Sequence, residues 1–189
     1  VVGISGASGA AIGVRIVELL AAAGVELHLV LSAAAERTLA HEVGPQAASD
    51  LGGLAARHHA IYDIGASIAS GSFGTAGMIV APCSIRTLAA IAGSHAGNLL
   101  VRAADVHLKE RRRLVLVVRE SPLHLGHLRT MATVTEFGAI VAPAVPAFYL
   151  RPATVADAID QIARRTIDLL VLNRPISRGW NGLNDGTGS

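Results

Sequence analysis

Two turns rich in small and hydroxyl-bearing residues follow apolar runs of the chain. The first turn contains Gly6 and Ser8, and the second contains Ser84 and Thr87. A glycine-rich turn between a strand and a helix lets backbone N–H groups approach an anion at the positive end of the helix. A second turn from a neighbouring strand, rich in Ser and Thr, can hold the same anion. Together the two turns predict a phosphate-binding site with two walls.

A third hydroxyl, that of Ser32, follows the apolar run 25–31, so side chains from three strand ends can meet in one crevice. The alternative for each hydroxyl taken singly is that it only caps a helix. The first glycines follow the spacing Gly3-x-x-Gly6-x-x-Gly9, which differs from the dinucleotide fingerprint G-x-G-x-x-G. No acidic residue ends the second strand, where a ribose would be held. The pattern therefore favours a mononucleotide phosphate.

Arg102 and Lys109 are seven residues apart in a segment with helical periodicity. Two helical turns separate them, so the two cations share one face of the helix and could clamp a second phosphate. The alternative is an ordinary charged helix that faces solvent.

Arg119 and Glu120 directly follow the apolar run 114–118. Ligands of a parallel α/β sheet bind beyond the carboxyl ends of the strands, so both side chains are expected at the ligand edge. Near Arg102 and Lys109, the carboxylate of Glu120 would be placed to transfer a proton to a leaving phosphate. The alternative is a simple Arg–Glu ion pair.

Other reactive side chains carry weaker signals. His124 and His127 have helical spacing but lack carboxylate or Cys companions at ligand spacing, so we predict no metal site. Cys83 has no base nearby in the sequence and is expected to serve packing rather than catalysis. Tyr149 could close a pocket and donate its hydroxyl to an anion, or it could be an aromatic residue at the rim of a site.

The elements that must position these residues alternate between strands and helices. Apolar and β-branched runs predict strands at 1–4, 25–31, 77–81, 114–118 and 139–142. Helical periodicity predicts helices at 10–23, 33–42, 85–92, 99–109 and 154–172. Thr154 is expected to cap the last of these, and Ser121-Pro122 is expected to open one more helix. Residues 44–74 are predicted to be rich in loops and could hold a short strand near 59–62.

This alternation predicts a single doubly wound, Rossmann-like α/β domain over residues 1–172, with a mostly parallel sheet and helices on both faces. Residues 173–189 are rich in Gly, Asn and Asp and are expected to form a partly flexible tail. Since Val1 already lies in an expected strand, we expect the true start of the chain to precede it.

The bulk composition bounds the class of protein. The chain has 189 residues, of which 51% are hydrophobic, and its mean hydropathy is +0.49. High apolarity without a run of about 18 or more apolar residues predicts an oligomer whose subunits cover each other's surface. The net charge is only +2, and the basic residues are scattered except at 109–113, which argues against a nucleic-acid-binding protein. A single Cys excludes an intrachain disulfide, and the absence of a visible targeting signal predicts a cytoplasmic location.

Several motifs taken together resemble the flavin prenyltransferases of the UbiX type, within the superfamily of homo-oligomeric flavin-containing Cys decarboxylases. The resemblance covers residues 1 to about 180. The motifs are, in order, Gly3-Ile-Ser-Gly-Ala-Ser-Gly-Ala10, Ser70-Gly-Ser-Phe73, Pro82-Cys-Ser-Ile-Arg-Thr-Leu88, Arg102-Ala-Ala-Asp-Val106, Leu108-Lys-Glu-Arg-Arg112, Arg119-Glu-Ser-Pro-Leu123 and Pro146-Ala-Phe-Tyr149 with Arg151-Pro152.

The resemblance implies an enzyme that joins a dimethylallyl group to N5 and C6 of reduced FMN, with dimethylallyl phosphate as donor and no metal. It implies a homo-oligomer, a dodecamer with active sites at subunit interfaces, whose prenylated FMN passes to a UbiD-type decarboxylase. The residues that it assigns to FMN binding are Gly6, Ala7, Ser8, Ser32, Ser84, Ile85, Arg86, Thr87 and Arg119.

The resemblance assigns the donor to a second group of residues, Arg102, Lys109, Tyr149, Arg165 and Trp180. Glu120 would exchange a proton with the leaving phosphate, and Glu42 would assist deprotonation at ring closure. Ser8 and Lys109 join these two carboxylates as catalytic residues. The family's usual Tyr and Lys near the flavin edge are absent here, where the chain has Ala11-Ile12 and Ala33.

Two other functions remain as alternatives. One is an FMN-binding accessory subunit of a decarboxylase, which would not need Glu42, Lys109 and Glu120. The other is a flavin-dependent cysteine decarboxylase. That group has a Pro-Ala-Ser-Ala-Asn type turn and a His near the first strands, whereas this chain has Pro82-Cys-Ser-Ile-Arg-Thr87 and no His before His28.

Overall fold

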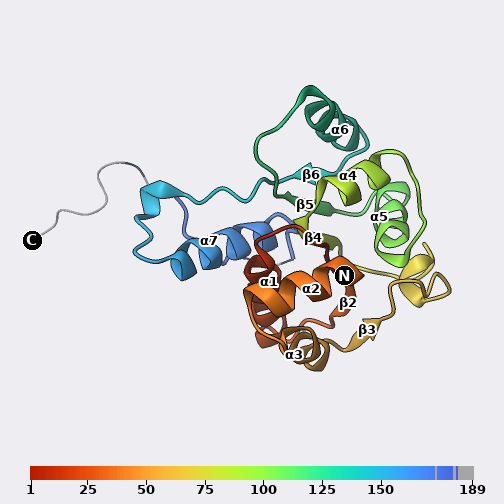
Figure 1. The fold of residues 1–189 in the computed structure, drawn as a ribbon, viewed down its shortest axis with the longest axis horizontal. Coiled ribbons are helices and arrows are strands. Elements are labelled where there is room, and N and C mark those ends of the chain that lie inside the picture. The colour runs from red at the N-terminus through yellow and green to blue at the C-terminus, as the bar shows by residue number, and fades with distance from the viewer. Residues whose placement is uncertain (173, 181, 183–189) are drawn as a thin grey trace, which may run out of the picture.

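The computed structural model describes residues 1–172, 174–180 and 182, which form a parallel sheet with helices on both faces (Figure 1). The sheet runs in the order β3-β2-β1-β4-β5-β6, and all neighbouring strands are parallel. The predicted doubly wound α/β fold is confirmed. The strands are β1 (Val2–Ile4), β2 (His28–Leu31), β3 (Arg57–His59), β4 (Met78–Cys83), β5 (Leu114–Val118) and β6 (Ile140–Val141).

The helices divide between two hydrophobic cores, one on each face of the sheet. One face carries α1 (Ala10–Ala22), α2 (Ala33–Glu42), α3 (Ala47–Leu54) and α7 (Val155–Asp168). The other carries α4 (Ile85–Ala92), α5 (Leu99–Lys109) and α6 (Leu125–Glu136). Successive residues of β4 alternate between these cores, with Ile79 on the first side and Val80 on the second. This burial on both faces explains the continuous apolar runs of the central strands.

Several predicted boundaries coincide with those of the structure because local caps define them. Ser32, Ser84 and Asn98 precede α2, α4 and α5, and each side chain accepts a hydrogen bond from the backbone N–H three residues later. Thr154 caps α7 as the sequence predicted, and together with Asp157 it forms a reciprocal capping box.

Three predictions about the helices are wrong. Residues 47–54 form helix α3 inside the region predicted to be rich in loops, because Ala47 and Leu51 pack into the core although two glycines lower the intrinsic helix propensity. Ser121-Pro122 does not open α6, which begins at Leu125 with His124 as its cap. Helix α7 ends at Asp168 rather than at residue 172 because the chain turns there, and Val171 adopts a positive φ of 55°.

A group of apolar side chains near η2 (Phe148–Leu150) is strongly exposed. The exposed fractions are 68% for Val145, 74% for Phe148 and 78% for Val155. Large apolar side chains that are exposed close together in the chain are typical of surfaces that bind another protein. Within the described ranges, no helix combines the length and the apolarity needed to cross a membrane. The flexibility predicted for 173–189 falls largely on residues outside the described ranges.

Candidate active site

The strand order reverses between β1 and β4, and the two predicted hydroxyl-rich turns follow these strands. Such a reversal opens a crevice at the carboxyl ends of a doubly wound sheet. Buried Ser5 joins the two turns, because its Oγ donates to the carbonyl of Pro82 (2.8 Å) and accepts from the N–H of Ser84 (2.7 Å). Our sequence reasoning missed Ser5. Its position as the first hydroxyl after β1 was the available signal.

Gly6 allows a close approach between the first turn and helix α2. A Cβ at position 6 would lie 2.3 Å from the Cβ of Ala34, a distance that no side chain can accept. The turn after β1 therefore packs directly on the start of α2, which brings Ser32 to the same edge of the sheet. Ala33, where the family usually has Lys, is exposed at this edge, whereas Ile12 lies in the core.

The hydroxyls of Ser32 and Ser84 do cap helices, which was the simpler alternative for each. Ser32 accepts from the N–H of Ala35 (3.1 Å), and Ser84 accepts from the N–H of Thr87 (3.3 Å) and donates to its hydroxyl (3.1 Å). Ser84 and Thr87 are both half-buried at the start of α4, so neither residue is closed off from solvent at the carboxyl end of β4. The first N–H groups of any helix have no partner within the helix, and those of Ile85 and Arg86 occupy this position in α4.

The carboxylate of Glu42, at the end of α2, lies at the start of α1. Its Oε2 accepts from the N–H groups of Gly9 (2.8 Å) and Ala10 (2.9 Å). Burial alone would raise the pKa of Glu42, but hydrogen bonds from Ser8 and from these two N–H groups, together with the charge of Arg119, outweigh it. The pKa of Glu42 therefore lies below its ordinary value, and the side chain is an anion near neutral pH.

Arg119 and Glu120 follow β5 at the same edge, and both are exposed. The Oε1 of Glu120 accepts from the N–H of Ser121 (3.0 Å). The structure does not contain the Arg119–Glu120 ion pair that we considered as an alternative, as far as the described residues show. Burial raises the pKa of the Cys83 thiol to about 12, in keeping with a packing role.

The residues expected to bind a donor fall into two separate groups. Arg102 and Lys109 lie on α5 and approach the segment after η1 (Ser67–Ala69). Arg102 donates to the carbonyl of Ala69 (3.1 Å) and pairs with Asp105 (2.9 Å). Lys109 pairs with Glu110.

The second group surrounds a cavity of about 660 Å³ beside α7, which both Tyr149 and Arg165 line. The rings of Tyr149 and Trp180 meet edge to face, with centroids 5.2 Å apart and planes at 76°. Helices α5 and α7 pack on opposite faces of the sheet (Figure 1). A single chain therefore does not bring Lys109 together with Tyr149 and Arg165.

The rings of His124 and His127 lie close together, with centroids 3.6 Å apart and planes tilted by 35°. Among the described residues, no group of three or more His, Cys, Asp and Glu side chains is arranged to hold a metal ion.

Comparison with known proteins identifies the family. Residues 1–164 match the family model named Flavoprotein. The flavin prenyltransferase UbiX of Thauera aromatica is 57% identical over 182 residues, which cover 96% of this chain and 93% of that protein. The chain belongs to the UbiX flavin prenyltransferase family. The predictions of a flavoprotein and of a prenyltransferase are thereby confirmed.

Solved structures of UbiX-family proteins have the same fold. The crystal structure of AnUbiX (PadA1), in complex with FMN and dimethylallyl pyrophosphate, superimposes with a TM-score of 0.90 and 46% identity and covers 96% of each chain. A dodecameric FMN-dependent UbiX-like decarboxylase from Escherichia coli O157:H7 also reaches a TM-score of 0.90, with 44% identity over 96% of this chain and 98% of that chain. The family relationship therefore extends over the whole crevice and over the cavity beside α7.

Proposed function

We propose that this UbiX-family enzyme transfers a dimethylallyl group from dimethylallyl phosphate to N5 and C6 of reduced FMN. The observation that carries the proposal is the crevice between β1 and β4, where paired hydroxyl turns stand beside Arg119, Glu120 and Glu42. The printed ligands of AnUbiX, FMN and dimethylallyl pyrophosphate, support the same assignment. Reduced FMN supplies the electron-rich ring atoms that accept the allyl group.

The strand-end turns fit the phosphate and the flavin of FMN. The N–H groups at the start of α4 and the hydroxyls of Ser84 and Thr87 would hold the phosphate, because they are half-buried donors at the positive end of a helix. Arg119 would add a positive charge. The remaining members of the site are Gly6, Ala7, Ser8, Ser32, Ile85 and Arg86, which lie along the same edge.

Cations would activate the donor in place of a metal. When the allylic C–O bond breaks, its electron pair goes to the phosphate, and Arg102, Lys109 and Arg165 would neutralise the growing charge. Tyr149 would donate its hydroxyl to the same phosphate. Trp180 offers a π-face to the allylic cation.

Two carboxylates would transfer the protons of the reaction. Glu120 is exposed at the ligand edge and would exchange a proton with the departing phosphate. Glu42 is held as an anion by Ser8 and by the start of α1, and it would accept the proton released when the new ring closes.

The donor site would be completed between subunits. Lys109 and Arg165 belong to opposite faces of one chain, so a second copy is needed to bring these cations to one phosphate. The exposed apolar group around Phe148 gives such a copy a surface to cover. We propose a cytoplasmic dodecamer of this kind, whose product is handed to a UbiD-type decarboxylase. If subunits share sites, co-assembly of inactive Lys109→Ala and Arg165→Ala chains should restore part of the activity.

The Lys109→Ala variant tests the division of roles. It should bind FMN within about twofold of the wild type but lose about a hundredfold or more in transfer rate, the usual effect of removing one charge-stabilising donor. FMN titration and phosphate release measure the two effects separately. Arg129→Ala, which removes an exposed cation from α6, is the matched control. A parallel loss of FMN binding in the Lys109→Ala variant would refute the assignment.

A further inference from the structure

The chain turns back after α7 and is fastened by one carboxylate. Asp168, the last residue of α7, accepts from the N–H of Ile176 (2.7 Å) and from the N–H of Ser177 (3.1 Å). The hydroxyl of Ser177 also donates to it. Both oxygens of Asp168 are thus used to hold residues 176–177, which lie eight and nine positions later.

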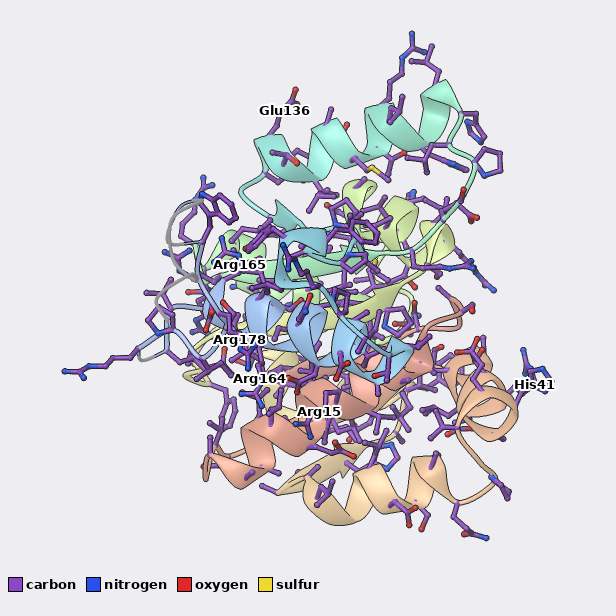
Figure 2. All side chains as sticks on the ribbon, turned by 90° about the vertical axis from the view of Figure 1, so that its left-hand side faces the viewer. Arg15, His41, Glu136, Arg164, Arg165 and Arg178 are labelled. Atoms are coloured by element: carbon purple, nitrogen blue, oxygen red, sulfur yellow. The ribbon has the colours of Figure 1, made fainter. Side chains whose placement is uncertain are left out.

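This attachment determines where the next side chains lie. Arg178 lines the cavity beside α7 that Tyr149 and Arg165 also line. Trp180 places its ring against that of Tyr149. Figure 2 shows Arg165, Arg178 and Arg164 gathered on one face of the molecule, over α7. We call residues 176–180 the strap.

The strap adds positive charge to a cavity whose carboxylates already have partners. Asp160 pairs with Arg15 (2.8 Å) and Arg164 (2.6 Å), and the other acidic lining residue, Asp157, is used in the capping box of α7. Arg151, Arg165 and Arg178 also line the cavity, and none of them forms an ion pair with any described residue. The cavity therefore suits a phosphate next to an apolar group.

We propose that Asp168 is a positioning residue for the prenyl donor, because it fixes the strap so that Arg178 lines the cavity and Trp180 lies against Tyr149, another lining residue. The inference rests on the proposed function, since it assigns the cavity to the donor. Asp168 touches neither flavin nor donor and acts through the backbone of Ile176 and Ser177. Asp168 forms its hydrogen bonds with Ile176 and Ser177 and with none of the residues assigned to FMN, so we expect FMN binding to be independent of it.

Asp168→Ala and Asp168→Asn test the proposal, with Asp50→Ala on α3 as the matched control. Asp168→Ala should raise the KM for dimethylallyl phosphate about ten- to a hundredfold, the range expected for lost hydrogen bonds to a charged group, and leave the Kd for FMN within about twofold. Asp168→Asn keeps one acceptor oxygen and should fall between this variant and the wild type. The control should leave both constants unchanged.

Trp180 gives an independent readout, because it is the only Trp of the chain. Loss of the attachment should make its fluorescence easier to quench with acrylamide in Asp168→Ala but not in Asp50→Ala. Unchanged quenching together with an unchanged KM would overturn the proposal, and so would an equal loss of FMN binding and donor binding. If the wild type transferred no prenyl group, the proposed function would fail, while the quenching comparison would still decide whether Asp168 holds the strap.

Discussion

Replacing Glu42 with Gln removes a charge that links the end of α2 to the start of α1. Gln keeps one oxygen that can accept from the N–H of Gly9 or Ala10, but it loses the ionic character of the bonds and their interaction with the helix dipole. A hydrogen bond to a charged group contributes about 1.5–3 kcal/mol and the dipole about 0.3–1 kcal/mol. Because Glu42 is exposed, we take the lower end and expect a loss of about 1–2 kcal/mol.

The sign of the pH dependence follows from the lowered pKa of Glu42 in the folded protein. The carboxylate stabilises the fold at pH values above its ordinary pKa of 4.5, and this contribution is lost as the pH falls through the lower value of the folded state. The difference between the wild type and Glu42→Gln should therefore be present near neutral pH and should shrink as the pH falls through the lowered pKa of Glu42 in the folded protein.

Thermal unfolding at one fixed protein concentration measures this difference. A loss of about 1–2 kcal/mol lowers Tm by about 2–8 °C for a chain of this size. Glu136→Gln, at the far end of α6 (Figure 2), should change stability by no more than about 0.5 kcal/mol. A Glu42→Gln variant as stable as the wild type near neutral pH, or a difference that persists unchanged in acid, would refute the reasoning.

Three further predictions concern buried groups. Burial lowers the pKa of His107 to about 4, so between that value and its ordinary 6.5 the unfolded chain binds more protons than the folded one. Stability should therefore rise with increasing pH in this window, by up to about 1.4 kcal/mol per pH unit, and unfolding measured in pH steps should show a smaller slope for His107→Gln. An equal slope in both proteins would contradict this. The Cys83 thiol, fully buried, should resist iodoacetamide at about pH 8 until denaturant is added, and immediate labelling of the folded protein would be the opposite result. A Cβ at Gly13 would lie 2.3 Å from the carbonyl of Ala81, so Gly13→Ala should cost about 1–3 kcal/mol in urea unfolding. Gly53→Ala, which meets nothing within 4 Å, should not destabilise the protein, and equal effects at the two positions would contradict the packing argument.

The parts of the fold that could be predicted are those with local signals. Ser32, Ser84 and Asn98 mark helix starts by capping, and the buried strand β5 is a continuous apolar run. Helix α3 could not be predicted this way, because its glycines oppose a helix and its packing against α1 and α2 holds it. Local patterns do not contain such tertiary contacts.

In the candidate site, too, the features with local sequence signals could be predicted and those that depend on tertiary contacts could not. Hydroxyl and charged residues after strands could be assigned to the ligand edge, because parallel strands place their carboxyl ends together. The hydrogen bonds of Ser5 join residues that are 77 and 79 positions apart in the sequence. Those of Asp168, which attach the strap, join residues 8 and 9 positions apart. No spacing rule predicts either set. The separation of Lys109 from Arg165 likewise depends on which face of the sheet each helix covers.

Anaerobic incubation of the wild-type protein with reduced FMN and dimethylallyl phosphate tests the central claim most directly. Mass spectrometry of the extracted flavin should show the gain of one C5H8 unit, with one inorganic phosphate released for each flavin changed. Unchanged flavin that stays bound would contradict the claim and favour an accessory FMN-binding subunit. Release of carbon dioxide from a peptide ending in cysteine, in a parallel reaction with oxidised FMN, would contradict it in favour of a cysteine decarboxylase.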